Sequence, residues 1–273
     1  MDNTFKEILS YFGMQNDPFS RDIDTTKLVQ LPGVQEALTN LGVFTQRRGI
    51  GILTGKSGSG KSCALRMLTG SLSSGLYRTV YLCHSTVSVG EFYGHLAAGF
   101  NLSPKGRRSS LFRQIKDHVV QLHKTDRIHP LVILDEAHNL SNEILMELRQ
   151  LVNFQYDSET CLSILLCGQD ELLARLRLSI LEPLTNSITT TVVMKTLSLD
   201  ETSSYLEERL KQVGARADLF SAPAVRSIHN ISHGVMRSIN TIATGGMIKA
   251  WRVKSAKVES DMITSLTGET EFR

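Results

Sequence analysis

The feature that most constrains this chain is a glycine-rich loop that joins a short apolar run to a stretch with helical character. The apolar residues 50–53 lead into a loop that ends in Gly60, Lys61 and Ser62. This spacing matches the phosphate-binding pattern G-x-x-x-x-G-K-[ST]. Glycines allow the backbone to curl so that successive N–H groups point at one anion. The residues expected to surround the phosphates are Gly55, Lys56, Ser57, Gly58, Ser59, Gly60, Lys61, Ser62 and Cys63.

Two side chains of this loop have separate expected roles. Lys61 is expected to place its charge on the β- and γ-phosphates of ATP, and the Ser62 hydroxyl to ligate Mg²⁺. Residues 63–68 continue as a helix, whose positive N-terminus would face the phosphates. The alternative is a chance glycine-rich turn. The strand expected before the loop and the helix expected after it favour nucleotide binding.

An acidic pair follows a second apolar run downstream. Residues 131–134 are apolar and are followed by Asp135 and Glu136, in the manner of a Walker B motif. Asp135 is expected to hold Mg²⁺ through water, and Glu136 to act as the general base that polarises the attacking water. The alternative is a solvated strand end. Because both motifs occur in the required order, ATP and Mg²⁺ are the expected cofactors and ATP hydrolysis is the expected reaction.

The composition indicates a globular protein but does not indicate which molecule it binds. The 273 residues are 41% hydrophobic and 21% charged, and the net charge is only +3, so the chain is globular and not strongly basic. No stretch approaches the ~20 apolar residues that span a bilayer, and the polar residues 1–7 do not resemble a signal peptide. The four cysteines form no C-x-x-C pair. They indicate reduced thiols, and the expected location is the cytoplasm.

The order of the expected elements predicts the fold class. Strands and helices alternate up to residue 194, and only helices are expected from residue 199 onward. This pattern predicts an α/β protein with a P-loop parallel-sheet core and a C-terminal helical lid. The expected helix caps are Asp200 for the first lid helix, and Ser109 or Ser110 for a helix that ends at Lys124. The expected regions are an irregular N-terminal segment at 1–34, the core at 35–197, the lid at 198–254 and a flexible tail at 255–273.

Two polar features each allow two interpretations. Gln169 follows the apolar run 162–167, and it is either a water-orienting group or a simple turn residue. The stretch 103–127 holds seven lysines and arginines against two aspartates, and it is either a DNA-contacting surface or a solvated helix face. The DNA-binding candidates are Lys105, Arg107, Arg108 and Arg113.

Several short segments together resemble the ExeA-type branch of the AAA+ ATPases. They are residues 11–13, 18–19, 135–140, 147–149, 153–154 and 167–172. The resemblance covers roughly residues 8–250. This branch includes secretion-pathway ATPases and transposon helper ATPases of the TnsC, TniB and MuB kind. The helpers bind ATP, assemble as rings or filaments around DNA, and activate a transposase at a target site.

The resemblance implies two further nucleotide-sensing residues and shows one departure. Gln169 would take the sensor-1 role, and Arg237 would be the sensor-2 arginine that reaches the γ-phosphate from the lid. Where relatives often carry an arginine finger, this chain has residues 184–188 without an arginine. The nearest arginines are Arg175 and Arg177. Hydrolysis is therefore expected to be slow, or to use an unexpected arginine.

The function predicted from these features is an ATP-dependent regulator of transposition, a form of DNA recombination. It would bind double-stranded DNA with little sequence preference, form a homo-oligomeric ring or helical filament, and recruit or activate a transposase. One alternative is a secretion-pathway assembly ATPase, and another is a nucleotide switch with a protein partner only. Secretion ATPases of this branch carry a membrane span and a cell-wall-binding region after the core, and we expect neither region and no membrane partner here.

Overall fold

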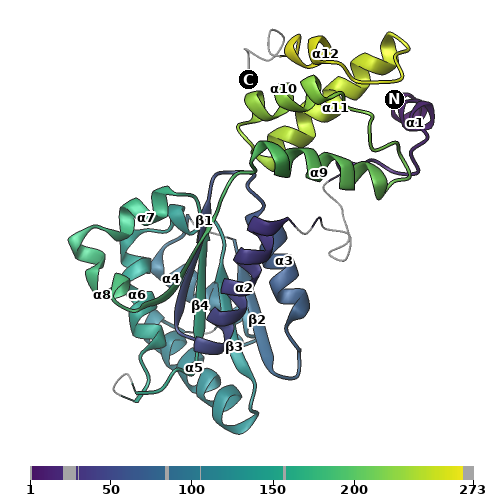
Figure 1. The fold of residues 1–273 in the computed structure, drawn as a ribbon. Helices are drawn as coiled ribbons and strands as arrows, with labels where there is room; N and C mark the ends of the chain where they lie inside the picture. Colours follow the sequence, from purple (N-terminus) through teal and green to yellow (C-terminus); the bar gives the residue numbers. More distant parts are fainter. Residues whose placement is uncertain are drawn as a thin grey trace. The chain divides into compact units, whose positions relative to one another are not determined.

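The described part of the chain forms two compact units. The computed structural model describes residues 2–20, 29, 31–83, 86–104, 106–155 and 158–266. One unit contains Met1–Gln35, Ser57–Cys63 and Lys195–Arg273, and the other contains Glu36–Lys56 and Ala64–Met194. We call them the helical unit and the sheet unit (Figure 1).

Five parallel strands form the centre of the sheet unit, in the order β2-β3-β4-β1-β5. The strands are β1 (Ile50–Gly55), β2 (Tyr77–Leu82), β3 (His129–Leu134), β4 (Ser163–Gly168) and β5 (Ile188–Met194). Every residue of β1, β3 and β4 is buried, whereas the edge strands β2 and β5 are partly exposed. Continuous apolar runs are typical of strands that are covered on both faces. The predicted α/β class with a parallel sheet is confirmed.

Helices cover both faces of this sheet. Ile52, Val132 and Leu166 share one core cluster with apolar residues of α4 (Val89–Gly99), α5 (Arg108–Val120) and α6 (Asn142–Val152). Phe44 of α2 (Pro32–Arg47) packs against Gly51, whose side of β1 is opposite to that of Ile52 because strand residues alternate. The remaining elements of the unit include most of α3 (Lys61–Ser71), η2 (Gln121–Thr125), η3 (Ala137–Asn139), α7 (Glu171–Leu176), η5 (Ser179–Leu181) and α8 (Glu182–Thr185).

The helical unit is built on four longer helices and a short one. They are α1 (Asp2–Tyr11), α9 (Leu199–Lys211), α10 (Ala222–Ser232), α11 (Met236–Arg252) and α12 (Ser260–Thr264). The buried guanidinium group of Arg209 on α9 donates hydrogen bonds to the backbone oxygens of Pro18 and Ser20. Phe19 packs against Phe220 with ring centroids 6.3 Å apart. The N-terminal segment is therefore packed against the helices of its own unit.

Four local expectations from the sequence were wrong. The segment expected to be irregular contains α1, which contacts α11 far along the chain. The tail expected to be flexible contains α12 and the buried Val258, which forms a β-bridge with Phe220. Helix α9 is capped by Ser198 in a capping box rather than by Asp200. Helix α5 begins at Arg108 with Arg107 at the N-cap position, so Ser109 and Ser110 lie inside the helix and do not cap it.

Candidate nucleotide-binding site

The glycine-rich loop begins where β1 ends at Gly55, and it ends where α3 begins at Lys61. Gly58 and Gly60 have φ angles of 79° and 100°, which side chains with a Cβ rarely adopt. A Cβ on Gly58 would lie 2.6 Å from the Cβ of Arg237. The loop therefore requires glycine at position 58 both for its curled backbone and for its packing.

Buried polar groups of this loop suit an anionic ligand. The side chain of Ser59 is only 1% exposed, and its hydroxyl has no hydrogen-bond partner within the described part of the protein. A buried hydroxyl without a partner is costly, and a bound phosphate oxygen would accept its hydrogen bond. Lys61 is also buried, with 8% exposure. Gly58, Gly60 and Cys63 are half-buried, whereas Lys56, Ser57 and Ser62 are exposed.

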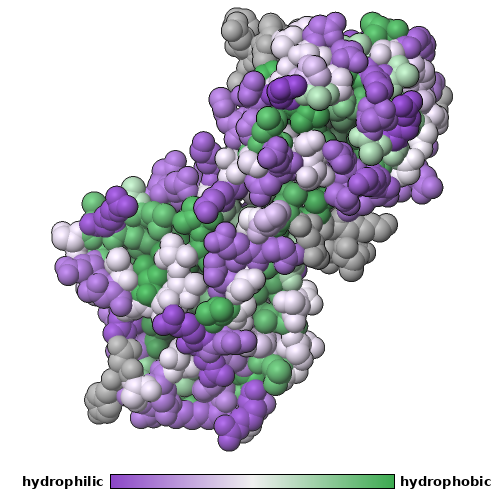
Figure 2. All heavy atoms as spheres, in the orientation of Figure 1, coloured by the Kyte–Doolittle hydropathy of each residue, from purple (hydrophilic) through white to green (hydrophobic). Residues whose placement is uncertain are grey.

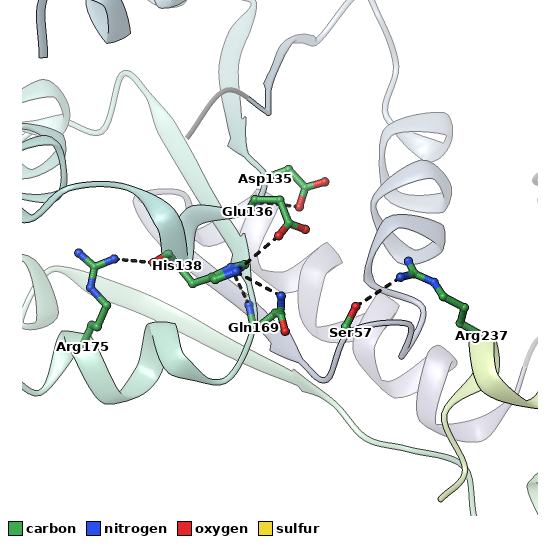
Figure 3. A network of polar contacts seen from close by, with 7 residues as sticks. All are labelled: Ser57, Asp135, Glu136, His138, Gln169, Arg175 and Arg237. Atoms are coloured by element: carbon green, nitrogen blue, oxygen red, sulfur yellow. Dashed lines mark hydrogen bonds and ion pairs between the residues drawn. The ribbon is translucent and has the colours of Figure 1, made fainter. Parts of the chain in front are cut away.

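Arg237 lies directly against the loop, within the helical unit. Its backbone N–H donates to the carbonyl oxygen of Gly58 at 3.2 Å, and its Nη1 donates to the Ser57 hydroxyl at 3.3 Å (Figure 3). Gly234 shapes the turn before α11, with a φ of 72° and a backbone oxygen of Leu197 only 2.1 Å from where a Cβ would lie. The first turn of α11 is therefore packed on the loop, so the structure places the predicted residue Arg237 beside Gly58 and Ser57.

In the sheet unit, the carboxyl ends of β1, β3 and β4 meet at one edge because these three strands are adjacent and parallel. Asp135 follows β3 and is 9% exposed. The Tyr81 hydroxyl donates to its Oδ2 at 2.6 Å, and the backbone N–H of Glu136 donates to its Oδ1 at 2.9 Å. Both carboxylate oxygens therefore have a fixed orientation. No motif in the sequence indicates a role for Tyr81.

Glu136, His138 and Gln169 form a polar network at the same edge (Figure 3). The Glu136 carboxylate lies 3.5 Å from His138 Nε2. The Gln169 side-chain amide lies 3.2 Å from the same nitrogen, and the Gln169 backbone N–H donates to His138 Nδ1 at 3.3 Å. The structure therefore brings together the two predicted residues Glu136 and Gln169 through His138. The sequence signal for His138 was its position two residues after Glu136, inside a segment already used for the family resemblance.

The two arginines considered as fingers have different surroundings. Arg175 donates from Nη1 to the backbone oxygen of His138 at 2.5 Å and from Nη2 to Asn142 Oδ1 at 2.6 Å (Figure 3). Arg177 is exposed. Both guanidinium ends of Arg175 are thus used within its own chain, whereas the side chain of Arg177 is exposed.

The predicted DNA-binding residues are only partly available to a ligand. Lys105 lies outside the described residues. Arg107 and Arg113 are exposed. Arg108 forms an ion pair with Glu147, which also accepts a hydrogen bond from the Tyr93 hydroxyl at 2.7 Å. Arg108 also lines an open groove of about 860 Å³ with Arg175 and the first turns of α4 and α6.

Within the described residues, no group of three or more His, Cys, Asp or Glu side chains could hold a metal ion. Mg²⁺ bound with a nucleotide uses one or two protein ligands together with phosphate oxygens and water. The hydroxyl of Ser62 and the carboxylate of Asp135 are ligands of the type that Mg²⁺ accepts. In the same described part of the chain, no helix is both long enough and apolar enough to cross a membrane.

Comparison with known proteins gives a family match over the region that contains the glycine-rich loop and the Asp135–Glu136 pair. Residues 45–176 match the family described as AAA domain. The chain has the fold of the P-loop AAA ATPases. The chain is 29% identical over 252 residues to General secretion pathway protein A of Aeromonas hydrophila. That match covers 91% of this chain but only 46% of the relative, so the chain spans about half of that protein's length.

Several solved structures resemble this chain in fold. Cdc6p of Pyrobaculum aerophilum has a TM-score of 0.68 at 19% identity, over 90% of this chain and 68% of that one. The ORC1 protein of Aeropyrum pernix, solved in complex with DNA, has a TM-score of 0.67 at 15% identity, over 93% and 69%. The RuvB branch migration motor of Thermotoga maritima has a TM-score of 0.55 at 14% identity, over 90% and 71%. At these identities the likeness shows the fold alone.

Proposed function

We propose that this chain is an ATP-driven switch in which nucleotide binding controls assembly. The observation that carries this proposal is the contact of Arg237 with the phosphate-binding loop, through its backbone at Gly58 and its side chain at Ser57. Charge placed on this loop by a nucleotide would attract the guanidinium group and alter that contact. The lid helix α11 would then report whether ATP is present.

Each predicted residue has a role in this proposal. In the helical unit, Lys61 and the N–H groups of the loop bind the phosphates, and the Ser59 hydroxyl donates to one of their oxygens. Ser62 and Asp135 would hold Mg²⁺, which supplies charge neutralisation when bound. In the sheet unit, Glu136 polarises the attacking water and Gln169 orients it. Tyr81 holds the Asp135 carboxylate in place for this task.

We further propose that the assembled protein binds DNA backbone and activates a transposase. Arg107 and Arg113 are exposed cations near the start of α5. The groove that Arg108 and Arg175 line also contains Glu143, so phosphate contacts in this region would depend on the arginine side chains. Such contacts address phosphates rather than bases, so binding would be indifferent to sequence. One protomer offers few cations, and a ring or filament that repeats them would supply the necessary avidity.

Exposed apolar side chains support self-assembly. Met146, Leu178 and Ile180 are 37%, 47% and 53% exposed, although all three are large and apolar. Figure 2 shows hydrophobic surface on the sheet unit in the area that α6, α7 and β5 occupy in Figure 1. Apolar surface that remains exposed on a monomer commonly marks a protein contact.

A second candidate function is the assembly of a secretion apparatus. It is favoured by the identity of 29% with General secretion pathway protein A over 91% of this chain. In this case the partner would be a protein, and the exposed cations would form a solvated helix face. The nucleotide site would work in the same way in both functions.

Electron microscopy and DNA binding separate the two functions. Images with ATP and duplex DNA, with ATP alone and with protein alone would show whether rings or filaments need DNA. We expect assemblies on DNA only when ATP is present. Assemblies that form with ATP but never include DNA would reject the transposition proposal and favour a protein partner. A protein that neither binds ATP nor assembles would reject the switch itself.

A further inference from the structure

We propose that His138 is a positioning residue for ATP hydrolysis. Its imidazole ring fixes the side chains of Glu136 and Gln169 in their positions relative to one another. This inference rests on the proposed ATPase function. The observation behind it is that one imidazole ring contacts both residues, through Nε2 to the Glu136 carboxylate at 3.5 Å and to the Gln169 amide at 3.2 Å (Figure 3).

The hydrogen bonds of the ring determine which nitrogen carries the proton. The backbone N–H of Gln169 donates to Nδ1, so Nδ1 must be an acceptor. A neutral imidazole then carries its proton on Nε2. The Nε2–H group then faces the Glu136 carboxylate at 3.5 Å. The Gln169 atom placed 3.2 Å from Nε2 is the amide nitrogen, so the amide must be turned by 180° to present its oxygen to this proton. In this tautomer the Nε2–H group is directed at the Glu136 carboxylate, and at the Gln169 oxygen once the amide is turned.

The backbone around His138 is fixed by three separate elements. Arg175 on α7 binds the carbonyl oxygen of His138, and the same guanidinium group binds Asn142 at the start of α6. At the end of β4, a Cβ on Gly168 would lie 3.1 Å from the backbone nitrogen of His138. Only a glycine allows so close an approach of the turn without a local shift. The backbone that carries the ring is therefore held by contacts with α7 and with the end of β4.

Glu136 needs such a partner because its own position is loosely defined. Its side chain is 47% exposed, whereas that of His138 is 13% exposed. The backbone of Glu136 has a left-handed conformation, with φ 53° and ψ 34°, so it forms a tight turn at the end of β3. Within the described part of the chain, His138 is the charged or polar side chain that contacts the Glu136 carboxylate. Without the ring, the Glu136 side chain would sample more rotamers and would spend less time in the orientation that polarises the attacking water.

Two substitutions to amide residues distinguish the role of Nε2 from that of Nδ1. His138→Gln places an amide N–H near the position of Nε2, so it keeps a donor toward Glu136 and Gln169. His138→Asn places an amide oxygen near the position of Nδ1, so it keeps the acceptor for the Gln169 backbone and loses the distant donor. A role limited to supporting the backbone would favour the asparagine variant. A positioning role toward the base would favour the glutamine variant.

The experiment measures kcat and KM for ATP in both variants, with ATP binding and thermal unfolding as controls. We expect His138→Asn to lower kcat about 10- to 100-fold with KM changed less than about threefold, as loss of a supporting hydrogen bond commonly does. His138→Gln should retain kcat within about fivefold of the wild type. Equal kcat in all three proteins, or an equal loss in both variants, would overturn the proposal.

A second measurement does not depend on turnover. Nitrogen-15 spectra of labelled histidine distinguish the two neutral tautomers, and the His138→Gln spectrum identifies the signals of His138. We expect the Nε2–H tautomer, and an Nδ1–H tautomer would overturn the proposal. Glu136→Gln provides the remaining control. If this variant and the wild type both bind ATP and neither hydrolyses it, the proposed ATPase function fails while the tautomer result still decides the role of the ring.

Discussion

The two halves of the nucleotide machinery are built in different ways. In the sheet unit, Asp135 and Gln169 follow fully buried strands, and their side chains are held by Tyr81 and His138. In the helical unit, Arg237 is exposed and reaches Ser57 through one hydrogen bond of 3.3 Å. Groups fixed by packing suit chemistry that needs accurate geometry, whereas an exposed guanidinium suits a group that must move when its ligand changes. In the proposed function, the sheet unit would therefore prepare the reaction and the helical unit would sense the nucleotide.

The largest effect is expected from removing the charge of the loop. Lys61→Ala should reduce ATP affinity by about 100-fold or more, because each hydrogen bond to a charged group contributes ~1.5–3 kcal/mol. Calorimetric titration with ATP and Mg²⁺ measures this loss. Arg66→Ala, at an exposed position on the same helix, is the matched control and should bind ATP as the wild type does. If Lys61→Ala binds ATP with the wild-type affinity, the loop is not part of the nucleotide-binding site.

The next effect tests whether the sheet unit carries the chemistry. Glu136→Gln should keep ATP affinity and lower kcat by about 10²- to 10⁴-fold, since the base is lost while the volume of the side chain is retained. Steady-state phosphate release and ATP titration on the same preparation measure both quantities. Hydrolysis by Glu136→Gln at the wild-type rate would show that another group is the base, and the contrast between the two units would lose its basis.

The sequence predicts the parts of the molecule that depend on local pattern. The apolar runs 50–53, 131–134 and 162–167 of the sequence fall almost entirely within β1, β3 and β4. The contact of Tyr81 with Asp135 joins residues 54 positions apart, and no spacing rule indicates such a pair. Helix α1 was missed for the same reason, because its partner α11 lies at the other end of the chain.

A pair of glycine substitutions sharpens the role of the loop. Gly58→Ala should weaken ATP binding about tenfold, because a Cβ would clash with Arg237 at 2.6 Å and strain a positive φ by ~1–3 kcal/mol. Gly70→Ala, on α3 with no atom within 4 Å of the new Cβ, should instead stabilise the fold by ~0.5–1 kcal/mol. Thermal unfolding and ATP titration compare the two variants. If both behave alike, the fit between loop and lid helix is unimportant.

A smaller effect on binding is expected at the sensing residue itself. Arg237→Ala should change ATP affinity little, since an exposed pair contributes ~0–1 kcal/mol, yet it should abolish the dependence of assembly on nucleotide. Arg237→Lys keeps the charge and should restore part of that dependence. Light scattering with ATP, with ADP and without nucleotide measures assembly. If assembly of Arg237→Ala depends on the nucleotide as in the wild type, Arg237 makes only a structural contact and does not sense the nucleotide.

The smallest effects are expected at the cations of the sheet unit, which test whether this unit also binds DNA. Arg107 is exposed, whereas Arg108 is already paired with Glu147, which raises the pKa of Arg108 and keeps its charge partly neutralised. Arg107→Ala should therefore weaken DNA binding more than Arg108→Ala does.

Each lost phosphate contact should lower the slope of log affinity against log salt concentration by about 0.9, equally for unrelated duplexes. Fluorescence anisotropy with two duplexes over a salt series, with and without ATP, measures these slopes. Arg216→Ala, whose guanidinium pairs with Asp218 in the helical unit, is the control and should leave the slope unchanged. If the double variant of Arg107 and Arg108 binds both duplexes as the wild type does, α5 presents only a solvated face. If the wild type binds no DNA even with ATP, the protein-partner switch becomes the better account, and the difference between the two units concerns ATP alone.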